Sequence, residues 1–208
     1  MKSRIQQLIL QGEGESLDYK QTISSSPKIA KTMAAFANHK GGTLLVGVRD
    51  NRTIAGIRPE EERYMLEQAA SFYCKPEIEI QMKEHSIDGL QLIECTIPEG
   101  DEKPYYALDE EDKWWVYIRV KDKSLVASKV VMDVLKKESS GKPNIISYGK
   151  NEEALLRYLR ENERINLSEF SKLVNISRRR ASKILVNLIS AGVIRNHTNE
   201  KTEFFTLS

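Results

Sequence analysis

The sequence is poor in the residues that build metal-bound or disulfide-linked folds. Its only two cysteines, Cys74 and Cys95, stand far apart and outside any CxxC pattern, so neither a zinc ribbon nor a disulfide framework is expected. The three histidines are scattered without the spacing of metal ligands. Both cysteines are therefore predicted to be small apolar residues of the fold.

Long hydrophobic runs are also missing. No apolar stretch approaches the roughly 20 residues that span a bilayer, and the N-terminal segment MKSRIQQLILQGEGE lacks the apolar core of a signal peptide. Hydrophobic residues make up 40% of the chain and charged residues 30%, as in an ordinary globular protein. We therefore expect a cytoplasmic protein that makes no contact with membranes.

The stretch FANHKGGTLLVGVRD, residues 36–50, reads as the end of a helix, a tight turn and an apolar strand. Gly41 and Gly42 permit a sharp reversal because glycine adopts positive φ without steric cost. Backbone N–H groups at such a turn can face an anion. The phosphate-binding pattern GxxxxGKS/T is absent, so an ATP site is not expected and the glycines are interpreted as a helix stop.

The periodicities predict two domains joined by a linker. Over residues 1–138 helices and strands mix without strict alternation, which indicates an α+β domain with a mixed sheet. Residues 139–150, SSGKPNIISYGK, form the expected linker, and residues 151–208 the second domain. The expected helices cover 3–10, 26–37, 59–72 and 128–138, and the expected strands 17–20, 43–48, 53–57, 77–81, 90–97, 104–108 and 115–120.

Three of these elements carry more detailed expectations. Ser26 is the expected N-cap of its helix, whose apolar stripe consists of Ile29, Met33, Phe36 and Ala37. In the strand at 17–20, Asp18 and Lys20 share one face. The strands at 77–81 and 90–97 are expected to form an antiparallel pair around the Asp88-Gly89 turn.

Charge is distributed unevenly over these two parts. From residue 151 onward there are ten Lys and Arg against seven Asp and Glu, a net charge of +3, whereas the remainder carries −1. The C-terminal domain is thus the basic one, which favours a polyanionic partner for that part of the chain.

Residues 151–208 carry three apolar helix patterns followed by two strand patterns. Asn166 and Glu169 make a capping box for the second helix, and Ser177 caps the third, which ends at Gly192. The pattern NLSEFSKLVNISRRRASKILVNLISAGVI resembles the winged helix-turn-helix family over the whole segment.

That resemblance implies a recognition helix whose N-terminal part enters the major groove of DNA. It points Arg178, Arg179, Ser182 and Lys183 outward, and Arg180 partly so. Arginines at the start of a helix oppose its dipole, which favours a nucleic-acid contact over simple solvation. Lys201 in the wing could reach the phosphate backbone. The alternative is a protein-interaction module whose arginines only solvate the helix.

The N-terminal domain carries GESLDYK, AFANHKGGTLLVGVRDNRTIAGI and YIRVKDKSLVASKVVMDVL. In this combination it resembles the Schlafen-type AlbA_2 family, also known as divergent AAA-4, over about residues 12–136. The resemblance implies an α+β fold and nucleic-acid binding, because bacterial members are described as transcriptional regulators. Three lysines around the glycine turn would add to such a surface: Lys20, Lys31 and Lys40.

The same resemblance implies a second activity. Animal Schlafen proteins cleave RNA with a metal site of three carboxylates, which would fall on Glu13, Asp18 and Asp50 and hold Mg²⁺ or Mn²⁺. Glu15 is an alternative match for the first position, and Asp18 stands where the family usually has glutamate. Read without a metal, Asp50 is a turn residue, and Glu13 and Glu15 lie in a solvated loop.

We therefore interpret the chain first as a prokaryotic DNA-binding transcriptional regulator without enzymatic activity, in which an AlbA_2-like domain precedes a winged helix. A metal-dependent endoribonuclease is the alternative, and a protein-interaction adaptor is the third option. DNA is the expected partner, and RNA the alternative one. Because a single winged helix binds weakly, a homodimer reading two half-sites fits the first interpretation.

Overall fold

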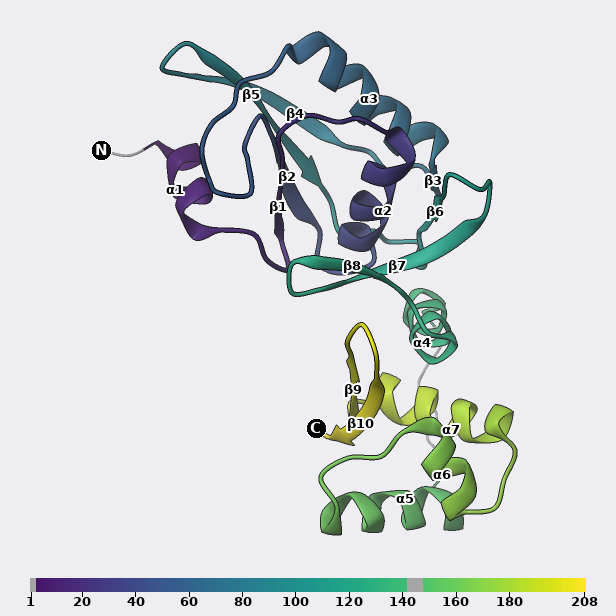
Figure 1. The fold of residues 1–208 in the computed structure, drawn as a ribbon. Helices are drawn as coiled ribbons and strands as arrows, with labels where there is room; N and C mark the ends of the chain where they lie inside the picture. The colour runs from purple at the N-terminus through teal and green to yellow at the C-terminus, as the bar shows by residue number, and fades with distance from the viewer. Residues whose placement is uncertain (1–2, 142–147) are drawn as a thin grey trace. The chain divides into compact units, whose positions relative to one another are not determined.

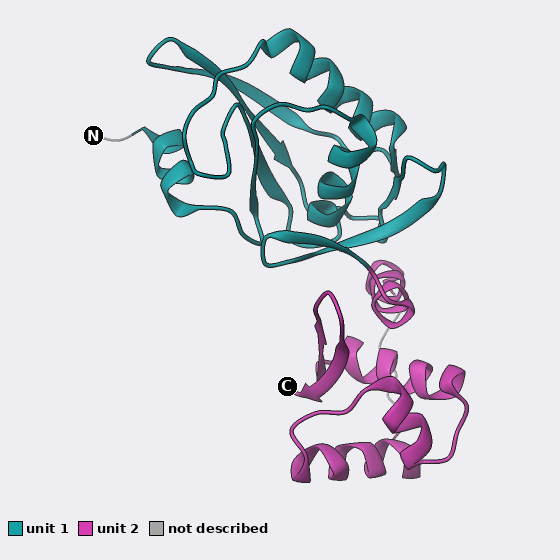
Figure 2. Cartoon of the chain, viewed as in Figure 1, with its two compact units in different colours: residues 1–126 teal, residues 127–208 magenta. Residues whose placement is uncertain are grey.

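The chain folds into two compact units, residues 1–126 and 127–208 (Figure 2). The computed structural model describes residues 3–141 and 148–208. Within those ranges no helix is both long enough and apolar enough to cross a membrane. Helices and strands are mixed in both units, so the predicted α+β class is confirmed.

Unit 1 contains two four-stranded sheets. In the first, with strand order β1-β2-β5-β4, β1 is parallel to β2 while the other pairs are antiparallel, so the expected mixed sheet is present. The second sheet, β3-β6-β7-β8, is antiparallel throughout. The first sheet consists of β1 (Leu17–Lys20), β2 (Gly42–Val46), β4 (Gln81–Ile87) and β5 (Leu90–Ile97). The second consists of β3 (Cys74–Lys75), β6 (Tyr106–Leu108), β7 (Trp114–Val120) and β8 (Lys123–Val126).

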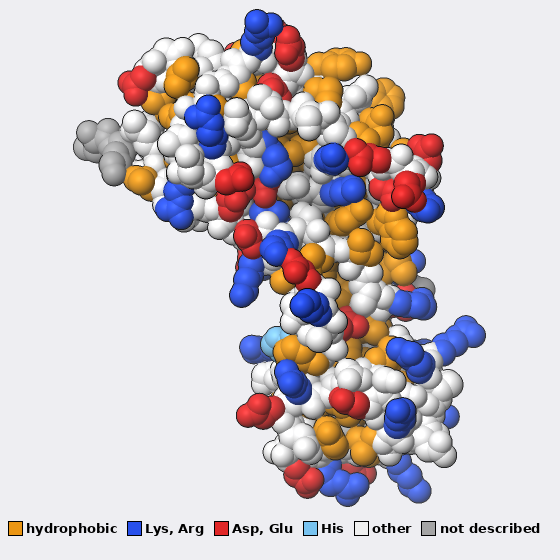
Figure 3. All heavy atoms as spheres, in the orientation of Figure 1, with side chains coloured by type: hydrophobic (Ala, Val, Ile, Leu, Met, Phe, Trp, Pro, Cys, Tyr) orange, Lys and Arg blue, Asp and Glu red, His pale blue; other side chains and the backbone are white. Residues whose placement is uncertain are grey.

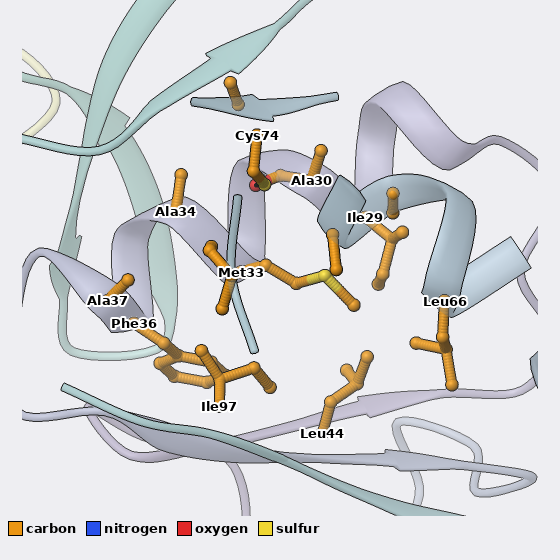
Figure 4. Packing of buried hydrophobic residues seen from close by; sticks show 14 of the residues in the cluster. Ile29, Ala30, Met33, Ala34, Phe36, Ala37, Leu44, Leu66, Cys74 and Ile97 are labelled. Atoms are coloured by element: carbon orange, nitrogen blue, oxygen red, sulfur yellow. Dashed lines mark hydrogen bonds between the residues drawn. The ribbon is translucent and has the colours of Figure 1, made fainter. Parts of the chain in front are cut away.

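Helix α2 (Ser26–Ala37) lies at the centre of unit 1, where it packs against strands of both sheets and against α3 (Pro59–Phe72) (Figure 1). Small side chains make this possible, because the alanines at 30, 34, 35 and 37 let neighbouring backbones approach from several sides. Phe36 lies against Ile97, and Ala30 lies beside Cys74 (Figure 4). The predicted one-sided apolar stripe is therefore too narrow, since the helix is buried almost all round.

The opposite face of the first sheet is covered by helix α1 (Arg4–Gln11). Side chains alternate along β2, so Leu44 and Val46 join the core around α2, while Leu45 joins Ile5 and Ile9 of α1. A central strand with both faces covered explains the continuous apolar run in the sequence.

One side chain joins the end of α2 to the second sheet. The amide nitrogen of Asn38 donates to the carbonyl oxygens of Tyr105 at 2.8 Å and Tyr117 at 2.9 Å, and its amide oxygen accepts from the backbone N–H of Tyr105 at 2.7 Å. Asn38 is only 5% exposed. The asparagine of the AFAN sequence therefore holds the two layers together.

Three local expectations differ from the structure. The strand expected at 77–81 lies at Gln81–Ile87 instead, and residues 77–80 are irregular. The strand expected at 53–57 is reduced to an isolated bridge between Val48 and Ile54. Gly47 has φ +103°, and its carbonyl accepts from both Ala55 and Gly56, so a regular ladder cannot continue past it. The cap of α2 is also one residue earlier than predicted, because the Ser25 hydroxyl accepts from the Lys28 N–H.

Unit 2 contains four helices and an antiparallel hairpin among its described residues. A bridge between Ile165 and Phe205 attaches the hairpin to the segment before α6. Its elements are α4 (Lys129–Ser139), α5 (Lys150–Glu161), α6 (Leu167–Leu173), α7 (Arg178–Ser190), β9 (Ile194–Thr198) and β10 (Glu203–Leu207).

Helix α4 belongs to unit 2, although we expected it to close the first domain. Val130 and Val134 are buried in the same core as the apolar residues of α7. The Lys137 ammonium donates to the Asn187 amide oxygen at 2.7 Å, and the Ser128 hydroxyl donates to the Glu203 carboxylate at 2.5 Å. The chain therefore divides before α4. Residues 142–147 of the expected linker lie outside the described residues.

The new division sharpens the charge difference between the two parts. Unit 2 has 15 Lys and Arg against nine Asp and Glu, a net charge of +6, and unit 1 has 17 against 21, a net charge of −4. On the visible face of unit 2, Lys and Arg side chains (blue) are more widespread than acidic ones (Figure 3). Moving the boundary from residue 151 to residue 127 doubles the positive charge assigned to the C-terminal part, and α4 itself contributes +1 of the increase.

Replacing Asn38 with alanine tests the junction between the layers. Asn38→Ala leaves one N–H and two carbonyl groups buried without partners. Each such group costs about 1–3 kcal/mol, so we expect the free energy of unfolding, measured in urea, to fall by about 3 kcal/mol or more. The control Gln7→Ala, at an exposed position of α1, should change it by less than about 0.5 kcal/mol. Equal effects of both variants would contradict the role given to Asn38.

The two free cysteines provide a test of the core of unit 1. Both are buried, and burial raises the pKa of the Cys74 and Cys95 thiols to about 12. Because only the thiolate reacts, iodoacetamide at mildly alkaline pH should label neither cysteine in the native protein and both in urea. The labelled cysteines are identified by mass spectrometry. Rapid labelling of the native protein would contradict the burial of Cys74 and Cys95.

Candidate nucleic-acid interface

Asp18, one of the three predicted metal ligands, is buried and already paired. Its carboxylate lies 2.8 Å from the Arg119 guanidinium and 2.5 Å from the Lys20 ammonium. The residue is only 4% exposed, and the strand placement explains the contact with Lys20, because residues two apart in β1 share a face. Two cations thus neutralise the carboxylate.

Arg119 on β7 connects several segments of unit 1. Its Nε donates to the Gly14 carbonyl at 3.0 Å, Nη2 donates to the Leu17 carbonyl at 3.3 Å, and its guanidinium lies 4.9 Å from the centre of the Phe36 ring. The side chain is 1% exposed. A buried arginine with these partners holds the glycine-rich loop before β1 against the second sheet.

The other two predicted ligands have different surroundings. A carboxylate oxygen of Glu13 accepts from the backbone N–H of Tyr19 at 2.8 Å, Asp50 is exposed in the turn after β2, and the alternative Glu15 is exposed as well. Among the residues that the structure describes, no group of three His, Cys, Asp or Glu side chains is placed to hold a metal ion. Glu13, Asp18 and Asp50 thus have three separate local environments.

The glycine turn is shaped by packing. Gly41 has φ +73°, and a Cβ there would lie 2.7 Å from the Ile97 carbonyl oxygen. Its N–H donates to the Phe36 carbonyl at 2.9 Å, and a Cβ at Gly42 would lie 2.6 Å from the Phe36 ring. The turn therefore needs glycine at both positions because the chain passes close to its neighbours, and the N–H of Gly41 has an internal partner.

The three lysines expected around this turn occupy different places. The parallel register pairs Leu17 with Thr43 and Lys20 with Val46, which puts Lys20 at the end of the β1-β2 ladder away from the turn. Lys31 lies 5.9 Å from the centre of the Tyr117 ring, on α2. Of the three, Lys40 alone lies in the turn itself, where it is exposed.

The basic residues predicted on unit 2 are better placed for an anionic partner. Arg178, Arg179 and Arg180 occupy the first turn of α7, whose N-cap Ser177 accepts from the Arg180 N–H, and all three are exposed, as is Lys183. Within residues 3–141 and 148–208, none of these four forms an ion pair with a carboxylate.

Lys201 lies at the tip of the β9-β10 hairpin, where it is exposed. The side-chain oxygen of Asn199 accepts from the backbone N–H groups of Lys201 and Thr202 at 2.9 and 2.8 Å. The Asn199 side chain thus fixes the turn that carries this cation.

Ser182 does not point into solvent as predicted. It is 8% exposed, because α4 packs along the flank of α7 that carries Ser182 and Val186. The prediction treated α7 as a helix with one buried face, whereas the structure buries a second strip of it under α4.

A groove of about 810 Å³ runs between α4 and α7. Leu167, Ser182 and Val186 belong to its lining, and Asp133 is the one acidic residue of the described lining. Because α4 was expected in the first domain, the half of this basic surface that α4 contributes was not predicted from the sequence. The apolar residues Val130 and Val134 could have indicated it, because they need an apolar partner to pack against. Among the described residues, six cationic side chains line the groove: Lys129, Lys136 and Lys137 on α4, and Arg178, Arg179 and Lys183 on α7.

Comparison with protein families identifies the N-terminal part of the chain. The model of the family described as "Schlafen, AlbA_2" matches residues 13–128, more than half of the sequence. The chain belongs to the Schlafen AlbA_2 family. The AlbA_2 match includes Asn38 and the Asp18–Arg119 pair, so both contacts are internal to the family domain. A second model, the PCI domain, matches residues 151–208, the segment that we expected to resemble winged helices.

Two solved structures resemble this AlbA_2 protein weakly. The DIP2311 protein from Corynebacterium diphtheriae is 19% identical with a TM-score of 0.47, and the match covers 71% of this chain and 29% of that one. The N-terminal domain of a RecG-related protein from Nitrosomonas europaea is 21% identical with a TM-score of 0.44, covering 62% and 97%. No curated protein matches the chain. Family membership therefore rests on the sequence model.

Substituting Asp18 tests whether its ion pair with Arg119 stabilises unit 1. Asp18→Asn leaves the Arg119 guanidinium buried without its counter-charge, and breaking a buried pair costs about 3–5 kcal/mol. We expect the midpoint of urea unfolding to fall accordingly. Asp50→Asn, at an exposed position, should alter the free energy of unfolding by less than about 0.5 kcal/mol. An Asp18→Asn protein as stable as the wild type would refute the structural role of the pair.

Proposed function

We propose that this AlbA_2 protein is a DNA-binding transcriptional regulator of a prokaryote, and that unit 2 contacts DNA through the first turn of α7. The observation that carries the proposal is the run Arg178–Arg180, exposed at a helix start and without carboxylate partners among the described residues. Three unpaired cations at the positive end of a helix dipole repel one another and the helix terminus. A phosphate backbone relieves that repulsion.

The order of elements in unit 2 supports the same proposal. Helices α5, α6 and α7 followed by the β9-β10 hairpin have the order of a winged helix-turn-helix module, with α7 in the position of the recognition helix. The connection between α6 and α7 is short, and Asn175 within it has φ +50°, a conformation that asparagine tolerates better than most residues. Lys201 would then be the cation at the tip of the wing.

The charges of the two units point to unit 2 as the DNA-binding part. A net charge of +6 attracts a polyanion over a long range, whereas the −4 of unit 1 repels it. In unit 1 the ammonium of Lys20 is paired with Asp18. We therefore assign the duplex contact to unit 2, and leave the AlbA_2 domain free for a separate ligand or for self-association.

Binding of a fluorescein-labelled duplex of mixed sequence, followed by anisotropy at several salt concentrations, tests the proposal. We expect Arg178→Ala and Arg179→Ala each to raise the dissociation constant about tenfold. Each should also lower the slope of log K against log salt by about one, because fewer counterions are released.

The double variant of α7 combines Arg178→Ala with Arg179→Ala. The matched control combines Arg157→Ala with Arg160→Ala, at two exposed arginines of α5, and loses the same charge. We expect this control to bind nearly as tightly as the wild type. Equal weakening by both double variants would show that net charge alone attracts DNA. If the wild type does not bind the duplex, or binds it with no dependence on salt, the proposed function is wrong.

A further inference from the structure

Helix α4 is fixed beside α7 by contacts along much of its length. Its first turn is held by the bond from Ser128 to Glu203 of β10, its middle by the burial of Val130 and Val134, and its last turn by the bond from Lys137 to Asn187. These contacts make the groove between the helices a built feature of unit 2.

The groove is strongly cationic. Of the described residues that line it, Asp133 alone carries a carboxylate, and it pairs with Lys129 at 3.2 Å. Lys137 is held by Asn187, which leaves Lys136 of α4 facing a solvent-filled space shared with the cations of α7. Lys136 is exposed and, within the described parts of the chain, has no carboxylate partner.

Because α4 is packed against α7, it restricts how α7 can bind in the major groove of a DNA duplex. The major groove is about 12 Å wide and accepts one helix. Two packed helices have axes about 8–10 Å apart and together measure about 20 Å across, so α4 and α7 cannot enter as a pair. The first turn of α7 can still reach base edges, whereas the remainder of the pair must lie against the rim of the groove, which is a sugar-phosphate backbone.

We propose that the groove between α4 and α7 binds the phosphodiester backbone of one DNA strand, with Lys136 and Lys129 on one wall and Arg179 and Lys183 on the other. This inference rests on the proposed function and names the part of the DNA that α4 contacts. The charges of the two walls match a chain of phosphates, and the apolar lining at Leu167 and Val186 suits the sugar edges between them.

The duplex-binding experiment is repeated with Lys136→Ala and with the double variant Lys129→Ala plus Lys136→Ala. We expect about fivefold weaker binding for each lysine removed and a salt slope lower by about one. Lys172→Ala, an exposed lysine of α6 outside the groove, is the single-charge control, and the α5 arginine pair is the double control. Lys137 is left unchanged because its bond to Asn187 supports the docking of α4.

A cross-link provides an independent readout. Because Cys74 and Cys95 are buried, Lys136→Cys introduces a single reactive thiol that can carry a benzophenone group. Irradiation should join position 136 to the duplex, while the same label on Lys172→Cys should give little product. Single-stranded DNA serves as a second probe, and a stronger cross-link to it than to the duplex would overturn the assignment to duplex DNA.

The outcomes separate this inference from the function on which it rests. If the variants of α7 lose binding while Lys136→Ala binds like the wild type and position 136 gives no cross-link, the groove is not part of the interface and the proposed function stands. If the wild-type chain does not bind duplex DNA at all, both proposals are wrong. Weaker binding by Lys136→Ala than by Lys172→Ala, together with the cross-link, supports the groove.

Discussion

Unit 1 depends on one buried amide. The side chain of Asn38 supplies donors and an acceptor at once, which no aliphatic or carboxylate side chain can do, and it uses them on backbone groups beside β6 and within β7. Helix α2 can therefore end between two sheets without leaving polar groups unpaired. The Asp18–Arg119 pair joins β1 to the second sheet in a similar way, with charge added.

The sequence predicted the α+β class, the mixed sheet, most helices and strand β5, because each depends on local periodicity, but it placed the partner of β5 at 77–81 instead of at Gln81–Ile87. It also placed Asp18 and Lys20 on one face of a strand. It could not predict that Asp18 would be neutralised by Arg119, since the two residues lie 101 positions apart and nothing local to either encodes the contact.

Helix α4 shows the same limit at the level of a whole element. Its periodicity predicts the helix, but an apolar face made of Val130 and Val134 can pack against many partners, and the local sequence does not specify that α7 is the partner. Ser182 was misplaced for a related reason, because a helix pattern with one strong apolar face conceals a second, narrower contact. Exposed residues such as Arg178 need no partner, so their placement could be predicted from the helix alone.

The position of α4 also bears on how this chain can be divided. The family matches cover residues 13–128 and 151–208, so the helix lies between the two modules and belongs to neither match. A C-terminal fragment cut at the border of its match would lose the cover over Ser182 and Val186, and an N-terminal fragment that kept α4 would expose Val130 and Val134 to water. The two modules are thus not interchangeable parts, and a soluble C-terminal fragment has to begin near residue 127.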